Sequence, residues 1–195
     1  MKTRPLGLAS ALVLAAVLAG CSAPGISAEY EPGGGEYVSG DGTTHFWPAA
    51  ERGEPIAFSG DTETGDALSS DDLAGQIVLV NFWYASCGPC RTEVADLNDL
   101  YDQYAAEDVA FVGVDIRDTP AQALSFIDDH DVLYPTIMDV SDNAVTLAFA
   151  TPAPPTTTPT TYLLDAQGRV AARFTSAIQS PSVVAAMIDD LLAEQ

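Results

Sequence analysis

A pair of cysteines at the junction of a strand and a helix is the feature that most constrains this chain. The apolar run Ile77–Trp83 is long enough for one buried strand, and Cys87-Gly88-Pro89-Cys90 follows it closely. Beyond the second cysteine, apolar residues recur every three or four positions, which predicts a helix with one apolar face. Both cysteines therefore stand on the first turn of that helix, where unpaired N–H groups stabilise a thiolate and a small disulfide can close.

Two other interpretations of the C-x-x-C pair are a zinc site and a structural disulfide. Zinc prefers about four ligands, and outside the pair the chain has only Cys21, His45 and His130. A structural disulfide more often joins distant segments. A C-G-P-C sequence at the end of a strand in a β-α-β pattern instead favours redox chemistry, and no metal site is expected.

The composition limits the classes of partner. The chain has 28 Asp and Glu against 7 Lys and Arg, a formal net charge of -21. Such a surface repels nucleic acid, so DNA or RNA binding is not expected. Solubility outside the cell or salt tolerance explains the charge, and a basic partner stays an open alternative. The 47% of hydrophobic residues is enough for a folded domain.

The first residues have the layout of an export signal. Lys2 and Arg4 precede an apolar stretch of Leu, Ala and Val, so residues 1–20 are interpreted as a lipoprotein signal peptide. The stretch ends in Leu18-Ala19-Gly20-Cys21, which resembles the bacterial lipobox, whose cysteine becomes the first mature residue and carries lipid. Lipidation of Cys21 would remove the odd cysteine of three and leave a matched pair. An ordinary secretory signal with a chance cysteine is the alternative.

Composition divides the remaining chain into a tether and a domain. Residues 21–52 are rich in Gly, Pro and Ser, so we expect a flexible tether there and a globular domain over residues 53–195. The domain pattern is a short strand or hairpin from Ile56, then β-α-β-α, a hairpin over residues 160–174 and a last helix from Pro181. This order predicts an α/β sheet with helices on both faces.

At these residues the chain resembles the thioredoxin superfamily, and within it the TlpA/ResA-like group of extracytoplasmic, membrane-tethered thiol–disulfide oxidoreductases. Three motifs carry the resemblance: Val80-Asn81-Phe82-Trp83 leading to the cysteine pair, Glu93 three residues after Cys90, and Thr158-Pro159-Thr160-Thr161 before an apolar strand. The resemblance implies a thioredoxin-like fold with a central mixed sheet flanked by helices and an N-terminal strand or hairpin extension.

The resemblance also implies a role for each site residue. Cys87 would be the exposed attacking thiolate, and Cys90, one turn inward, would resolve the mixed disulfide. Pro159 would be cis and face the cysteines, Thr158 would offer backbone groups to a substrate strand, and Trp83 would join the substrate-binding surface. The alternative for Pro159 is an ordinary proline in a Pro/Thr-rich loop.

Glu93 is the expected proton-handling residue. Its spacing from Cys90 puts both on the core-facing side of the helix, where burial raises the pKa of a carboxyl group. Cytoplasmic thioredoxins, which resemble this stretch, have a buried Asp where this chain has Asn81, and Asn cannot ionise. The alternative is an exposed Glu that only interacts with the helix dipole.

The function expected from the resemblance is a lipid-anchored, extracytoplasmic thiol–disulfide oxidoreductase with no cofactor beyond the Cys87–Cys90 disulfide. It would reduce protein disulfides, with apocytochrome c as a candidate substrate and a membrane thiol reductase of the CcdA/DsbD type as the electron donor. Three alternatives stay open: a thiol peroxidase of the redoxin type, an oxidant or isomerase that installs disulfides, and a non-catalytic binding module.

Overall fold

The computed structural model describes residues 37–38, 43–151 and 153–195. In these residues a seven-stranded sheet has the order β1-β2-β9-β8-β5-β6-β7, and β3 and β4 form a separate antiparallel pair. The strands are β1 (Tyr37–Val38), β2 (Thr44–Phe46), β3 (Ser59–Asp61), β4 (Ala67–Ser69), β5 (Ile77–Trp83), β6 (Val109–Asp115), β7 (Thr136–Met138), β8 (Thr160–Leu164) and β9 (Val170–Thr175). The helices are the 3-10 turn η1 (Ser70–Leu73), α1 (Gly88–Gln103), α2 (Pro120–His130), α3 (Ala144–Ala148) and α4 (Pro181–Ala193).

The central strand is β5, and all seven of its residues are buried. It runs parallel to β6 on one side and antiparallel to β8 on the other, so the sheet is mixed. The run of apolar residues in β5 matches this position, because a strand covered on both faces has no solvent side on which polar residues are needed. The predicted α/β class, mixed sheet and N-terminal hairpin are confirmed.

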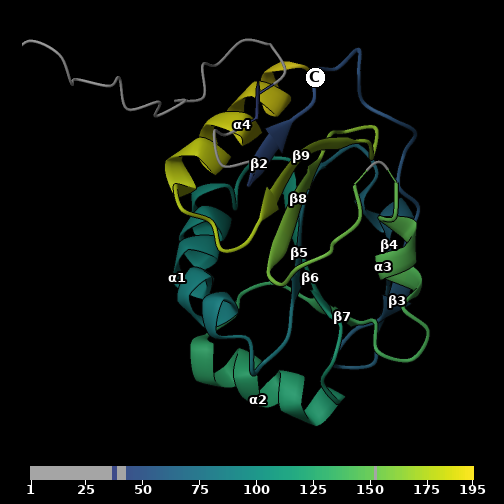
Figure 1. Ribbon diagram of the computed structural model, residues 1–195, viewed down its shortest axis with the longest axis vertical. Helices are drawn as coiled ribbons and strands as arrows, with labels where there is room; N and C mark the ends of the chain where they lie inside the picture. Colours follow the sequence, from purple (N-terminus) through teal and green to yellow (C-terminus); the bar gives the residue numbers. More distant parts are fainter. Residues whose placement is uncertain (1–36, 39–42, 152) are drawn as a thin grey trace, which may run out of the picture.

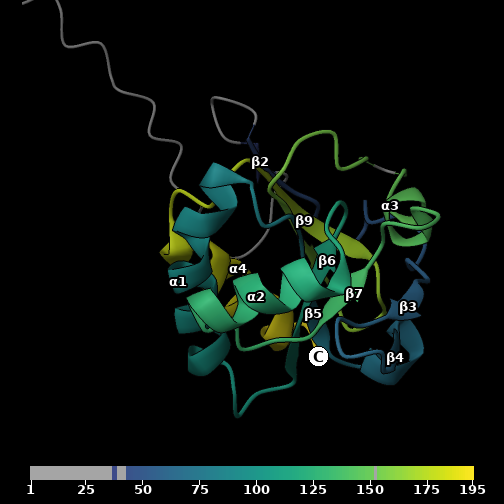
Figure 2. The ribbon, with the colours of Figure 1, turned by 90° about the horizontal axis from the view of Figure 1, so that it is seen from below.

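Helices cover the two faces of the sheet unequally (Figures 1 and 2). α1, α2 and α4 lie on one side, and α3 lies on the other side with the β3–β4 pair. The strand period of two divides the side chains of β5 between these layers. Ile77 and Leu79 belong to the cluster that includes residues of α1 and α4, whereas Val78, Val80 and Phe82 pack with residues of α3.

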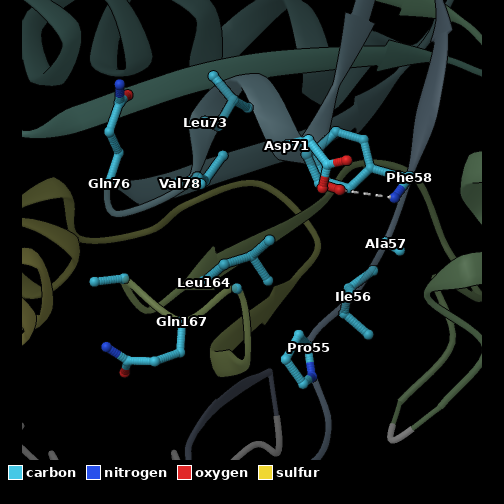
Figure 3. A pocket seen from close by; sticks show the side chains of 14 residues that line it. Pro55, Ile56, Ala57, Phe58, Asp71, Leu73, Gln76, Val78, Leu164 and Gln167 are labelled. Carbon is cyan, nitrogen blue, oxygen red and sulfur yellow. Dashed lines mark hydrogen bonds between the residues drawn. The ribbon is translucent and has the colours of Figure 1, made fainter.

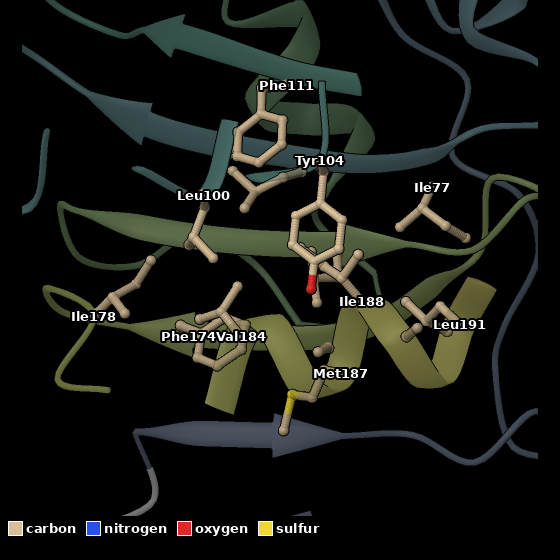
Figure 4. Packing of buried hydrophobic residues seen from close by; sticks show 14 of the residues in the cluster. Ile77, Leu100, Tyr104, Phe111, Phe174, Ile178, Val184, Met187, Ile188 and Leu191 are labelled. Atoms are coloured by element: carbon tan, nitrogen blue, oxygen red, sulfur yellow. The ribbon is translucent and has the colours of Figure 1, made fainter. Parts of the chain in front are cut away.

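The larger hydrophobic core lies between the sheet and helices α1 and α4. Leu100 and Tyr104 of α1 meet Ile188 and Leu191 of α4 there, over side chains of the sheet (Figure 4). The Tyr104 hydroxyl donates to the backbone oxygen of Ala185 at 2.9 Å, which satisfies the polar end of a buried ring. This packing fixes α1 against the sheet and so fixes the position of its first turn.

The expected boundary between tether and domain at residues 52 and 53 is wrong. Thr44–Phe46 form β2, which pairs antiparallel with β9, and Phe46 is 2% exposed. The Arg52 side chain is fully buried and forms ion pairs with Asp165 and Glu194. The folded domain therefore begins before residue 53. The signal peptide, Cys21 and the tether up to residue 36 lie outside the described residues.

Among the helices of the described part of the chain, none is both long enough and apolar enough to span a membrane.

Candidate redox site

The two cysteines form a disulfide at the N-terminus of α1, with a Cα–Cα distance of 5.3 Å. Cys87 is the N-cap residue, and its Sγ accepts a hydrogen bond from the backbone N–H of Cys90 at 3.2 Å. Pro89 lies in the first turn, where a missing N–H costs no intrahelical bond. The predicted placement of the pair between a strand and a helix is confirmed. The N–H of Cys90 and the helix dipole would both stabilise a thiolate on Cys87.

Cys87 is not exposed in this oxidised form, contrary to the expectation. Cys87 is 3% exposed and Cys90 is 2% exposed, so burial does not distinguish them. The reason is the cap geometry, which turns the Cys87 sulfur toward the first helical turn. The neighbouring residues Ser86, Gly88 and Pro89 are exposed, so the surface that a partner first meets is backbone and small side chains.

Glu93 lies one turn further along α1 and is 1% exposed. Its Oε1 accepts from the side-chain amide of Asn81 at 2.9 Å, and its Oε2 accepts from the backbone N–H of Ile178 at 3.1 Å. The Asn81 amide also donates to the Thr161 hydroxyl oxygen at 2.9 Å. The predicted core-facing position is therefore correct, and β5, β8 and the segment before α4 all contribute to holding this carboxyl group.

The environment of Glu93 raises its pKa from 4.5 to about 7. Burial is the largest cause, because it penalises the charged form, and the charge of Asp96 adds to it. The hydrogen bonds from Asn81 and Ile178 act in the opposite direction. A carboxyl group with a pKa near neutral can bind and release a proton at the pH at which cysteine thiols react.

A cavity of about 10 Å³ lies beside Cys90 and is also lined by Asn81, the amide that binds Glu93. This volume is close to the minimum that one water occupies. The cavity lining otherwise consists of Trp83, Val94, Phe126, Val132 and Tyr134. Cys90 and the amide that binds Glu93 therefore border the same small, mostly apolar space.

The peptide bond between Thr158 and Pro159 is cis, as expected. Phe82 is the register partner of Thr160, so the antiparallel pairing of β5 and β8 brings Pro159 next to Trp83, at the end of β5 from which the cysteines follow. Pro159 is buried, and Thr158 is half-buried. The loop thus lies at the same edge of the sheet as the disulfide, where its backbone can meet a bound polypeptide.

Trp83 does not form a substrate-binding surface, contrary to the expectation. It is 3% exposed, and its ring lies 4.5 Å from that of Phe126 in α2. It belongs to the cluster that contains Cys87 and Cys90, so it packs beneath the disulfide. Gly113 on β6 makes room for the indole, since a Cβ atom there would lie 2.8 Å from the Trp83 Nε1.

Sequence reasoning missed two buried carboxyl groups, Asp115 and Asp118. Asp115 ends β6 opposite Trp83, and its Oδ1 accepts from the backbone N–H groups of Arg117 and Asp118 at 2.9 and 2.8 Å. The Oδ2 of Asp118 accepts from the backbone N–H of Ala85, two residues before Cys87. The signal was an Asp directly at the end of a buried strand, at the edge where the cysteines lie.

Burial also raises the pKa of Asp115, from 3.8 to about 6, and the nearby Asp118 charge adds to that rise. Two backbone N–H donors act against it. The segment that leads to Cys87 is therefore held by the Asp118 side chain from the β6–α2 connection, next to a second carboxyl group whose pKa is raised.

The remaining candidate sites are separate from the disulfide. The described residues contain no group of three or more His, Cys, Asp or Glu side chains that could hold a metal ion. A pocket of about 180 Å³ is lined by Ile56, Phe58, Val78 and Leu164 among others (Figure 3). It lies toward the start of β5, whereas the cysteines follow the end of that strand, so the pocket is not part of the redox site.

A disulfide at a helix N-terminus, a buried carboxyl group one turn away and a cis-proline loop at the same sheet edge together define a thioredoxin-fold dithiol site. The sequence model of the AhpC/TSA family matches residues 53–173. The chain belongs to this family.

Curated relatives and solved structures agree with this class. Residues of this chain are 28% identical over 106 positions to the thiol-disulfide oxidoreductase ResA of Bacillus cereus, covering 54% of this chain and 58% of that protein. A ResA from Oceanobacillus iheyensis is 32% identical over 99 residues, 51% of this chain and 49% of that protein. The chain thus matches about half of the length of these relatives.

The structural neighbours cover more of both chains. A DsbF homologue from Corynebacterium diphtheriae is 30% identical with a TM-score of 0.68, and the match covers 80% of this chain and 99% of that one. A secreted thiol-disulfide isomerase from Corynebacterium glutamicum is 29% identical with a TM-score of 0.68, covering 82% and 98%. The predicted thioredoxin-like fold and the resemblance to ResA-like oxidoreductases are therefore confirmed.

Proposed function

We propose that this chain is a thiol–disulfide oxidoreductase that reduces protein disulfides through Cys87 and Cys90. The observation that carries the proposal is the capped disulfide, in which the N–H of Cys90 donates to the Cys87 sulfur at the helix N-terminus. The same donor would stabilise the Cys87 thiolate after reduction. ResA of B. cereus, which is named a thiol-disulfide oxidoreductase, supports this assignment.

In the proposed reaction, the Cys87 thiolate attacks one sulfur of a substrate disulfide and forms a mixed disulfide. The second substrate sulfur leaves as a thiolate and takes a proton. The Cys90 thiolate then attacks the Cys87 sulfur, releases the first substrate sulfur, and closes the Cys87–Cys90 disulfide. Two electrons pass from the dithiol to the substrate. Glu93, with a pKa of about 7, is the proposed acceptor of the Cys90 proton.

The test is reduction of insulin by the reduced full chain. Cys87→Ser is expected to abolish it, since the attacking thiolate is lost. Cys90→Ser is expected to stop turnover while a covalent adduct between Cys87 and insulin accumulates, because nothing resolves the mixed disulfide. Undiminished turnover by Cys87→Ser would overturn the mechanism.

The direction of electron flow is proposed from the Gly-Pro dipeptide between the cysteines, which is thioredoxin-like. A reduction potential near thioredoxin's, about −270 mV, would fit a reductant, and one near DsbA's, about −120 mV, would fit an oxidant that installs disulfides. Equilibration of the full chain with dithiothreitol or glutathione measures it.

The same preparation tests for a thiol peroxidase, which would consume hydrogen peroxide, and for a binding module, whose disulfide would resist mild reductant.

We propose an extracytoplasmic location with a lipid anchor on Cys21, on the basis of the signal-like residues 1–20 and the lipobox. The similar protein from C. glutamicum is described as secreted. A membrane thiol reductase of the CcdA/DsbD type would then recharge Cys87–Cys90, and apocytochrome c is the candidate substrate. Incorporation of labelled fatty acid that disappears in Cys21→Ala would support the anchor. Equal labelling of both chains would contradict it.

A further inference from the structure

The few basic residues of this acidic chain are distributed unevenly. Of the seven Lys and Arg residues, five arginines lie in the described part of the chain. Arg52 is buried, and Arg169 and Arg173 are half-buried. Within the described ranges, only Arg91 and Arg117 are exposed. Arg91 directly follows Cys90, and Arg117 lies two positions after Asp115, the register partner of Trp83, at the edge of the sheet where the cysteines follow β5.

Both exposed arginines contact the short segment that leads to Cys87. Arg91, on the first turns of α1, donates from Nε to the backbone oxygen of Ala85 at 2.9 Å. Arg117, after β6, has its guanidinium carbon 4.1 Å from the centroid of the Tyr84 ring. The segment itself is held by Asp118, which accepts from the Ala85 N–H. The two guanidinium groups are thus positioned before any partner arrives, which lowers the entropy cost of binding.

Among the described residues, neither guanidinium group forms an ion pair with a carboxylate. Over the residues that the structure describes, the ion pairs of 4.0 Å or less involve Arg52 and Arg169, bound to Asp165 and Glu194. The three buried carboxyl groups of the site, Glu93, Asp115 and Asp118, accept hydrogen bonds from amide or backbone N–H donors. In a chain with 28 acidic residues, these two arginines keep terminal guanidinium N–H groups available for another molecule, while Arg91 Nε binds Ala85.

We infer that Arg91 and Arg117 form a docking site for a carboxylate side chain close to the disulfide of a substrate polypeptide. This inference rests on the proposed function. Guanidinium groups bind carboxylates through two parallel hydrogen bonds, which makes such a site selective for charge and for orientation. Residues 151–164, which include the cis-proline loop, contain no charged residue. The two arginines therefore determine whether the site prefers an acidic or a basic side chain on the substrate.

The rest of the surface is acidic, which limits where on a substrate an acidic side chain is attracted. Charges are screened beyond about 8 Å at physiological ionic strength, so only an acid close to the reacting disulfide would be attracted by the arginines. An acidic region elsewhere on a partner would face repulsion. The partner that fits best therefore presents an Asp or Glu within a few residues of the cysteine that Cys87 attacks.

The test uses three peptides that carry the same disulfide flanked by Glu, Gln or Lys. The reduced full chain reacts with each, and the second-order rate constants are compared at low and high salt. We expect the Glu peptide to react about tenfold faster than the Gln peptide at low salt, with the ratio falling toward one as salt is added. The ratio is informative because a change in the intrinsic reactivity of Cys87 affects both peptides equally.

Variants separate a local effect from net charge. Arg91→Gln with Arg117→Gln is expected to abolish the preference for Glu. Adding Asp71→Asn and Asp108→Asn, two exposed residues toward the opposite end of β5, restores the net charge without restoring the guanidinium groups, so the preference should stay lost.

The outcomes are distinct. Three results would overturn the docking site and leave the proposed function standing. They are equal rates for all three peptides, a preference for the Lys peptide, and a preference for the Glu peptide that survives the double arginine substitution. Failure to reduce any peptide would overturn the proposed function and this inference with it.

Discussion

Buried charged groups have different partners at the two ends of β5. Toward its start lies the anchor end, defined by Arg52, Asp165 and Glu194. There the buried guanidinium is 3.1 Å from Asp165 and binds both oxygens of Glu194, at 2.6 and 2.7 Å. Beyond its other terminus lies the redox end, defined by the cysteines, Glu93, Asp115 and Asp118. There the described residues provide amide donors and no cation within ion-pair distance of the carboxyl groups.

This difference separates a charge that is fixed from charges that can change. At the anchor end, burial alone would lower the pKa of Arg52, but the hydrogen bonds and charges of Glu194 and Asp165 raise it, so the guanidinium stays charged. At the redox end, burial raises the pKa of Glu93 to about 7 and of Asp115 to about 6. Paired charges connect distant segments of the chain, and unpaired carboxyl groups exchange protons.

The largest expected effect comes from breaking the anchor end. Arg52→Met removes the buried cation that links Asp165 to Glu194 and leaves the buried Asp165 carboxylate with Arg169 as its remaining ion-pair partner. Removing one partner of a buried ion pair costs about 3 to 5 kcal/mol, which we expect as the loss in free energy of unfolding, measured with urea. The reduction potential and the rate of thiol exchange should stay at their original values.

Arg169→Gln is the matched control for this prediction. Arg169 also binds Asp165, at 2.7 Å, but its side chain is 27% exposed. A partly exposed pair contributes about 1 kcal/mol or less, so this variant should lose much less stability. If the two variants lose equal free energy of unfolding, or if Arg52→Met changes the reduction potential, the proposed difference between the two ends is wrong.

The second prediction concerns the pH dependence of stability. Because the pKa of Glu93 in the folded protein is raised from 4.5 to about 7, the folded state holds this proton more tightly than the unfolded state does. The associated stability is present below pH 4.5 and is lost as the pH rises through about 7. The shift corresponds to roughly 3 kcal/mol across that window, and Asp115 adds a loss of the same sign.

Glu93→Gln isolates the contribution of Glu93. Gln cannot ionise, so unfolding free energies measured from pH 5 to 8 should decline less steeply than those of the unmodified chain. The Gln amide also faces one N–H donor, from Asn81 or Ile178, which lowers stability equally at every pH and leaves the slope unchanged. Parallel pH profiles for the two proteins would show that Glu93 is ionised normally in the folded state.

How far the redox end could be predicted depends on how local its residues are. Glu93 could be found because Cys90 and Glu93 lie on the same helix, three residues apart, and share a face. Pro159 was found only through a resemblance, since no local rule predicts a cis bond. Asp118 was missed because its contact with Ala85 spans 33 residues and forms only when β6 pairs with β5.

The anchor end was harder to predict. Residues up to Arg52 are rich in Gly and Pro, and a strand as short as Thr44–Phe46 carries no alternating pattern to detect. Its place at the edge of the sheet is set by pairing with β9, more than 120 residues later in the chain. The tether was therefore expected to continue through a segment that tertiary contacts order.

The smallest expected effect tests whether Asp118 acts through its hydrogen bond or through its charge. Asp118→Ala removes the acceptor for the Ala85 N–H and should lower stability by about 1 to 2 kcal/mol and slow thiol exchange, since the segment before Cys87 loses its support. Asp118→Asn keeps an acceptor and removes the charge. Its amide can also donate to the Asp115 Oδ2, which has no partner among the described residues.

We therefore expect Asp118→Asn to match the unmodified chain in stability within about 0.5 kcal/mol at pH 8, with a lower pKa for Asp115 because a neighbouring negative charge is gone. Carbon-13 NMR titration of the Asp115 carboxyl group measures that pKa directly. Asn and Ala at position 118 could instead lower the stability and the rate of thiol exchange by equal amounts. In that case the charge of Asp118, and not its hydrogen bond to Ala85, stabilises the segment before Cys87. Both ends of β5 would then depend on charge. They would differ only in that the carboxylates of the anchor end have a cation as partner and those of the redox end do not.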